Sequence, residues 1–180
     1  MILVSNMLNR IILFFIFLGI FSVSFAAGAE VQVSEEESAI VLEQFESLIG
    51  NIDAVGIFVH NLSLSIPMFI PGFGIAWGAF AAFSTGMAFS VLQNANPMLE
   101  NIPSLTILFM TPFGLMEVAA YSIAMSRSYM IVHKMIKRMP IRPDARIIGL
   151  EIAILVGLLL AGGFVEYYFI ENIPRDMPKI

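Results

Sequence analysis

Long apolar segments separated by short polar ones dominate this chain, and they restrict the folds that it can adopt. Hydrophobic residues make up 58% of the sequence and charged residues only 13%, whereas soluble domains carry about 25% charged residues. A helix that crosses a bilayer needs about 20 mostly apolar residues. We therefore predict an all-α integral membrane bundle of about five transmembrane helices. Their approximate ranges are 7–27, 53–70, 73–92, 104–124 and 147–170.

The first segment has two interpretations. Arg10 precedes the apolar run Ile11–Val23, as expected of an anchor helix that starts in the cytoplasm. The run ends in the residues SFAAGA at 24–29, which resemble a signal-peptidase site. We predict that residues 1–30 form an N-terminal anchor helix, with a cleaved signal peptide as the alternative.

Residues 31–50 differ in character from the segments around them. The stretch Glu30–Glu46 is acidic and contains no Lys or Arg. Ser34 and Glu37 have the spacing of a capping box, in which each side chain binds the backbone N–H of the other residue at a helix start. Apolar residues at helical spacing follow, so we predict an extracytoplasmic amphipathic helix that lies on the membrane or on the other helices. These apolar residues are Val41, Leu42, Phe45, Leu48 and Ile49.

Residues 51–174 form the predicted four-helix membrane domain, and residues 175–180 form a short tail. Pro67 is expected to kink the second segment, because proline removes a backbone donor. Pro71–Gly72 is a turn signal, which predicts a tight hairpin between the second and third segments. The fourth segment is expected to run through Pro112 as one span and to continue into a basic loop.

Positive charge is concentrated in one part of the chain. Six of the nine basic residues fall within the 20 positions from Arg127 to Arg146. Basic loops stay in the cytoplasm, so we place this loop inside and the acidic helix outside. The prediction is a multi-pass protein of the cell membrane with a cytoplasmic N-terminus and an extracytoplasmic C-terminus.

Small residues recur at every fourth position in the third and fifth segments. That spacing keeps them close to one helix face, and small residues let membrane helices approach closely. We interpret both faces as helix-packing surfaces; a narrow substrate path lined by small residues is the alternative. The two faces consist of Gly74, Gly78, Ala82 and Gly86, and of Gly149, Ala153, Gly157 and Ala161.

Polar residues also occur inside the predicted spans. His60 and Asn61 lie in the second, Glu117 in the fourth, and Glu166 near the outer end of the fifth. An ionised carboxylate in lipid is costly, so such groups face protein or water, find partners, or stay protonated. We interpret Asn61 and Glu117 as interhelical hydrogen-bonding groups that fix the helix register. A proton- or ion-linked role is the alternative.

The sequence shows no recognisable catalytic centre. It has no cysteine, and its two histidines, His60 and His133, fall on opposite sides of the predicted membrane. Glu151 lies close to the basic loop and is expected to pair with Arg146. We expect no catalytic residues, no metal site and no cofactor, and we expect no nucleic-acid partner.

Several features together resemble the stage II sporulation protein M family of bacteria and archaea. The family pattern in the fourth span is Pro-His-Gly, two residues, then Glu, and Phe113 stands here where relatives usually have His. The resemblance covers about residues 50–174 and implies a polytopic scaffold, which in spore formers holds together a complex of cell-wall hydrolases. It rests on Phe58-Val59-His60-Asn61, Pro71-Gly72-Phe73-Gly74, TPFGLME at 111–117, and Phe164-Val165-Glu166 before Pro174.

These observations favour a non-catalytic membrane scaffold or accessory subunit that assembles with other membrane proteins in the lipid bilayer. One alternative is a small transporter or channel that uses Glu117 and Asn61. Another is an accessory subunit of a large membrane enzyme complex, such as a monooxygenase or a respiratory complex.

Overall fold

The computed structural model describes residues 2–49, 52–97, 99 and 102–172. Within these residues the chain is helical and has no strand, which confirms the all-α prediction. The predicted tail, residues 175–180, lies outside the described part. The elements are α1 (Ile2–Ala29), α2 (Glu35–Ile49), α3 (Ala54–Ser65), the 3-10 helix η1 (Ile66–Phe69), α4 (Phe73–Ala95), α5 (Ser104–Met110), α6 (Pro112–Ile136), the 3-10 helix η2 (Arg142–Asp144) and α7 (Ala145–Asn172).

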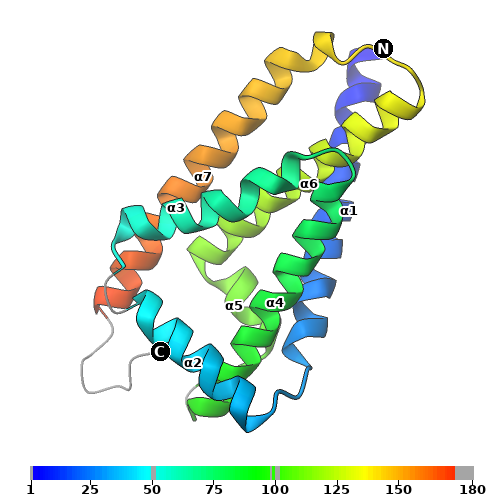
Figure 1. The fold of residues 1–180 in the computed structure, drawn as a ribbon. Coiled ribbons are helices and arrows are strands. Elements are labelled where there is room, and N and C mark those ends of the chain that lie inside the picture. The colour runs from blue at the N-terminus through cyan, green and yellow to red at the C-terminus, as the bar shows by residue number, and fades with distance from the viewer. Residues whose placement is uncertain (1, 50–51, 98, 100–101, 173–180) are drawn as a thin grey trace.

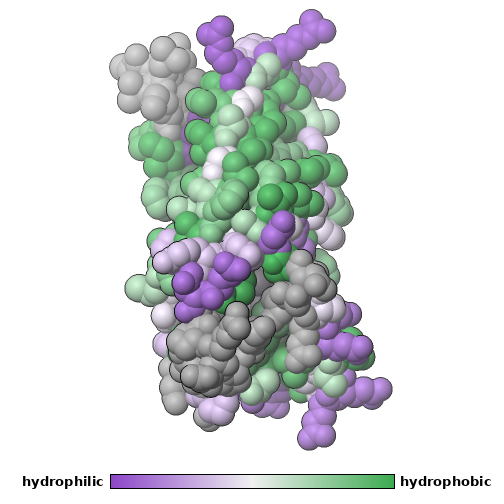
Figure 2. Space-filling view, turned by 90° about the vertical axis from the view of Figure 1, so that its left-hand side faces the viewer, coloured by the Kyte–Doolittle hydropathy of each residue, from purple (hydrophilic) through white to green (hydrophobic). Residues whose placement is uncertain are grey.

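Three stretches of helix are long and apolar enough to cross a membrane. They are Leu8–Ala29 in α1, α4, and the stretch Arg142–Asn172 that includes α7. The pair α5 and α6 would make a fourth if the two counted as one bent span, and Ala54–Phe69 is a shorter apolar helix. Figure 2 shows hydrophobic residues in a broad band on one face, with hydrophilic residues at its upper end and again below it.

The helices give the molecule two distinct ends. The N-terminus and the basic connection between α6 and α7 lie together at one end, and the acidic α2 lies at the other (Figure 1). Helices α1 and α4 run side by side in the same direction, and α6 packs along α7. This arrangement agrees with the predicted separation of the basic loop from the acidic helix.

Helices α1 and α4 touch at the level of their backbones. A Cβ added at Gly28 of α1 would overlap the carbonyl oxygen of Phe83, and one added at Gly86 of α4 would overlap the carbonyl oxygen of Phe25. The two glycines therefore act reciprocally, each accommodating the other helix. This is the close approach that small residues permit between membrane helices.

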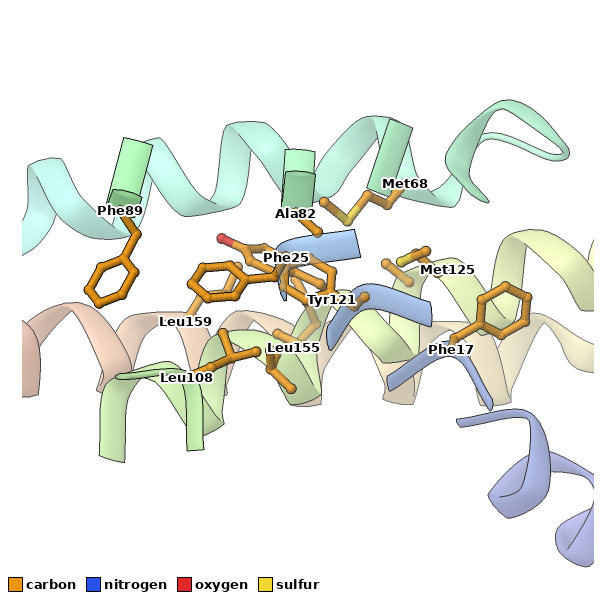
Figure 3. Close-up of a cluster of buried hydrophobic side chains, with 14 residues drawn as sticks. Phe17, Phe25, Met68, Ala82, Phe89, Leu108, Tyr121, Met125, Leu155 and Leu159 are labelled. Atoms are coloured by element: carbon orange, nitrogen blue, oxygen red, sulfur yellow. The ribbon is translucent and has the colours of Figure 1, made fainter. Parts of the chain in front are cut away.

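A buried cluster of large side chains fills the space between α1, α4, α6 and α7. Phe25 of α1 is 1% exposed, and its ring lies 6.1 Å from that of Phe89 on α4 (Figure 3). The ring of Phe21, also on α1, lies 5.4 Å from that of Tyr121 on α6. Leu155 and Leu159 of α7 complete the cluster from the opposite side, and both are buried. Helices α1 and α4 approach closely at Gly28 and Gly86. This approach holds the face of α1 that carries its buried phenylalanines against α6.

The fourth predicted span is broken rather than continuous. Helices α5 and α6 meet at a bend of 88° at Thr111. Proline disfavours a helical conformation at the residue before it, and Thr111 is extended, with φ −93° and ψ 135°. Its hydroxyl donates to the carbonyl of Ile107 at 2.6 Å and accepts from the N–H of Gly114 at 3.1 Å, so one side chain ends α5 and caps α6. Helix α6 then continues to Ile136, which shortens the predicted basic loop.

The expected tight hairpin between the second and third segments is also corrected. Helix α3 makes its extensive contacts with α7, and it reaches α4 mainly through η1. Pro67 is the second residue of η1, which follows α3 directly, so the helix changes from α to 3-10 geometry at this proline. The Pro71–Gly72 turn is held by Ser128 of α6, which donates to the carbonyl of Ile70 at 2.7 Å and accepts from the N–H of Gly72 at 3.1 Å. Gly72 has a φ of +80°, a conformation that glycine adopts without strain.

The amphipathic helix and its capping box are confirmed. The N–H of Glu37 donates to the Ser34 hydroxyl at 3.3 Å, and the N–H of Ser34 donates to the Glu37 carboxylate at 3.3 Å. The Ser34 hydroxyl also donates to the Glu37 carboxylate, at 2.7 Å. This bond, together with the one from the Ser34 N–H, lowers the pKa of Glu37 because both stabilise its ionised form.

Replacing Gly86 with Leu tests the helix crossing. The new side chain would force α1 and α4 apart, and such overpacking costs about 1–3 kcal/mol. We expect Gly86→Leu to lower the free energy of unfolding by about that amount in an SDS titration of mixed micelles. Gly157→Leu is the matched control, because nothing lies within 4 Å of a Cβ there. Equal destabilisation by both variants would contradict the crossing.

Candidate functional site

Asn61 and Glu117 are brought together as the sequence analysis proposed. The side-chain amide of Asn61 in α3 donates a hydrogen bond of 2.7 Å to the carboxylate of Glu117 in α6. Asn61 is 7% exposed, and the two residues lie 56 positions apart in the chain. The bond therefore fixes the register of α3 on α6.

Glu166 of α7 joins this pair. Its carboxyl group lies within hydrogen-bonding reach of Glu117. A hydrogen bond between two carboxyl groups requires a proton on one of them. The buried Tyr121 is close enough to both carboxyl groups to sense their charge. Three helices, α3, α6 and α7, thus meet at one polar cluster. We call Asn61, Glu117 and Glu166 the carboxyl cluster.

His60 does not join the carboxyl cluster, although it directly precedes Asn61. Its side chain is exposed, whereas Asn61 is buried. Within the described ranges, no group of three or more His, Cys, Asp or Glu side chains is placed to hold a metal ion.

A second polar cluster lies toward the basic end, and the sequence analysis missed it. Arg127 of α6 is 1% exposed, and its Nε donates to the Glu151 carboxylate at 2.5 Å. Arg10 of α1 forms an ion pair with the same carboxylate. Asp144 lies 3.7 Å from Arg127 Nη1 and 2.5 Å from Lys134 Nζ. This ionic cluster ties α1, α6 and the start of α7 together.

The expected pairing of Glu151 with Arg146 is therefore wrong. Arg146 is exposed, and Glu151 binds Arg10 and Arg127 instead. A fully buried arginine needs a carboxylate, because an uncompensated buried charge is strongly destabilising. The available signal was Arg127 itself, a cation flanked by Ser126 and Ser128 in a helix otherwise rich in small and apolar residues.

The two small-residue faces behave differently. On α4, Gly74, Gly78, Ala82 and Gly86 are all buried against neighbouring elements. On α7, Gly149, Ala153, Gly157 and Ala161 are all exposed. Helix α7 packs within the chain through another face, which includes Leu155, Leu159, Gly162 and Gly163. The expected packing of α7 through its fourfold-spaced face is therefore not found among the residues that the structure describes.

Phe113, at the position where the resembled family usually has His, packs against another ring. Its centroid lies 6.0 Å from that of Phe169 on α7, in an edge-on arrangement. At this position the chain holds α6 to α7 by aromatic contact.

No family model, curated protein or solved structure matches the chain. The resemblance to the stage II sporulation protein M family therefore stays a prediction.

A double-mutant cycle tests the Asn61–Glu117 bond. Interhelical hydrogen bonds in membrane proteins contribute about 0.6 kcal/mol on average and up to about 1.7 kcal/mol. We expect Asn61→Ala and Glu117→Ala to show a coupling energy in that range when unfolding is measured in mixed micelles. His60→Ala is the control, since its exposed side chain should show no coupling to Glu117. A coupling no larger for Asn61 than for His60 would refute the register role.

Proposed function

We propose that the chain is a membrane-embedded, non-catalytic scaffold or accessory subunit that assembles with other membrane proteins. The observation that carries this proposal is the exposed small-residue face of α7. The face offers Gly149, Ala153, Gly157 and Ala161 over three turns, and nothing lies within 4 Å of a Cβ at either glycine. We call these four residues the α7 stripe.

The comparison with α4 supports this interpretation. The same fourfold spacing on α4 is filled by neighbouring backbone and side chains, including the carbonyl of Met68 at Gly74 and the side chain of Met125 at Gly78. Small residues give no advantage against fluid lipid, but they allow close contact with another helix. A partner helix could pack on the α7 stripe at the level of the backbone, as α1 packs on α4 at Gly86.

The proposal includes a multi-pass topology in the cell membrane. The N-terminus and the basic connection would lie in the cytoplasm, with α2 and the C-terminus outside. The shared location of the N-terminus and the basic residues supports this orientation (Figure 1). Counting α3 with η1 and the bent pair α5 and α6 as crossings gives five spans. The buried aromatic face of α1 supports a retained anchor helix over a cleaved signal peptide.

Native purification tests the assembly role. We expect the tagged chain, extracted in mild detergent from its own cells, to co-purify with at least one membrane protein. Gly157→Leu should reduce that recovery severalfold, because a leucine side chain would hold a partner helix away from the stripe. Ile152→Phe adds bulk at an exposed α7 position outside the stripe and should leave recovery unchanged. Recovery of the wild-type chain as a lone monomer would overturn the proposal.

A second candidate function, a proton- or ion-linked transporter, is favoured by the carboxyl cluster. Transporter sites are often built near broken helices whose ends line a polar path. Glu117 lies one to two turns from the break at Thr111, and Asn61 lies on the short helix that ends before Pro67. The contact between Glu117 and Glu166 would let a proton or a cation bind between two spans.

Flux measurements test this second function. In proteoliposomes that contain a pH-sensitive dye, a transporter should carry protons down an imposed gradient. Glu117→Gln should reduce that flux at least about tenfold, as expected when an essential proton-carrying group is lost. His60→Gln alters an exposed neighbour of the cluster and should have no effect. Flux that survives Glu117→Gln unchanged would exclude this mechanism.

A further inference from the structure

A groove separates α2 from α4 at the end of the molecule opposite the basic residues. Its larger part is a cavity of about 440 Å³ whose walls include Val33, Ile40, Val41 and Met87. Its smaller part, about 130 Å³, also reaches Val41 and continues between Phe45 and Leu92. Because Val41 lines both cavities, they form one groove along the apolar side of α2.

The groove walls are mostly apolar, with Gln32, Glu37 and Gln44 among them, and they are open to the surroundings. The apolar side of an occupant would therefore be stabilised there. Ile40 is 51% exposed at its rim. Removing such surface from water is favourable in proportion to its area. The larger cavity has the volume of a typical ligand pocket, which is enough space for several apolar side chains.

The helix that forms one wall of the groove is strongly acidic. Glu37 lines the groove itself, and Glu35, Glu36 and Glu43 are exposed elsewhere on α2. The sequence has no Lys or Arg between Arg10 and Arg127, so that whole stretch supplies no lysine or arginine to balance them. An anionic lipid headgroup would be repelled by the negative charge of α2.

We propose that this groove binds a basic amphipathic helix of a partner protein on the extracytoplasmic side. Apolar residues of that helix, spaced i, i+3, i+4 and i+7, would fill the space beside Val41 and Phe45. Its Lys or Arg residues would lie against the α2 glutamates. This is the helix-in-groove mode of recognition, with charge complementarity setting specificity. The inference names the chemistry of one partner and rests on the proposed assembly function.

A peptide-binding experiment tests the inference. The full chain is placed in nanodiscs of phosphatidylcholine, and the probe is a fluorescein-labelled 18-residue peptide of Leu and Lys in an amphipathic helical pattern. We expect saturable binding by fluorescence anisotropy, above the signal from empty nanodiscs. A peptide of the same composition with the pattern scrambled should bind at least about tenfold more weakly, since it presents no apolar face.

Variants on the two walls locate the binding. Reversing three exposed charges of α2, with Glu35→Lys, Glu36→Lys and Glu43→Lys, should weaken binding about tenfold or more. Val41→Trp should fill the groove from α2, and Ala88→Phe should fill it from α4, each weakening binding without a change of charge. Helical content by circular dichroism shows that these variants are folded. Glu171→Lys changes an exposed acidic residue at the end of α7 and should leave binding unchanged.

Three outcomes would overturn the inference. Binding that is equal in empty nanodiscs would show adhesion to lipid alone. Binding that survives both charge reversal and groove filling would place the peptide elsewhere. A bound lipid acyl chain that Val41→Trp displaces, without peptide binding, would make the groove a lipid site. Co-purification that depends on the α7 stripe tests the assembly function separately, so failure at α2 leaves that function standing.

Discussion

Backbone contact between α1 and α4 determines where the other helices can lie. Gly28 and Gly86 each receive a carbonyl group of the opposite helix, so the two axes approach more closely than larger side chains would permit. That approach turns Phe17 and Phe21 toward Tyr129 and Tyr121 of α6, while Phe25 packs on Phe89 of α4, and all three phenylalanines are buried. In a lipid environment the hydrophobic effect does not drive helices together. If the bundle lies in a membrane as proposed, close packing of this kind contributes a larger share of its stability than it would in water.

Two polar clusters link the helices to one another in addition to the apolar packing. Near the basic end, Glu151 accepts from Arg127 and pairs with Arg10, which links α1 and α6 to α7. At another level, the carboxyl cluster links α3 and α6 to α7. Charged groups taken out of water need partners of opposite sign or hydrogen bonds. Both clusters supply such partners across different helices, although Nη2 of Arg127 is buried without a hydrogen bond among the described residues. Each cluster therefore specifies which helices are neighbours.

The sequence predicts where the helices lie along the chain better than it predicts which helices pack against each other. Apolar runs and the Ser34–Glu37 capping box located α1, α2, α4 and α7, because these signals are local. Pro112 indicated a disturbance, but the 88° bend depends on Thr111 bonding to both Ile107 and Gly114. Those bonds exist only once the backbone has turned. A continuous span and a corner are therefore equally compatible with the residues.

Long-range pairing was predictable only in part. Asn61 and Glu117 were predicted to form interhelical hydrogen bonds, because a polar residue in an apolar span needs a partner. The structure pairs the two residues with each other. Glu151 was predicted to pair with Arg146, the cation closest to it in sequence. That prediction was wrong because Arg127 and Arg10 come near Glu151 only in the folded bundle. Spacing alone could not show that the α4 face is buried and the α7 face open. That difference depends on which side of each helix meets a neighbour.

The corner at Thr111 has a consequence for bilayer thickness. Helix α6 has 25 residues, which at 1.5 Å per residue makes it about 38 Å long. That length is sufficient for the hydrocarbon core of about 30 Å, but α6 is apolar enough for a span only when it is taken together with α5. If the pair crosses a bilayer as proposed, the sharp corner between the two helices would let α6 tilt to suit a thinner or thicker bilayer while α5 stays turned away from it.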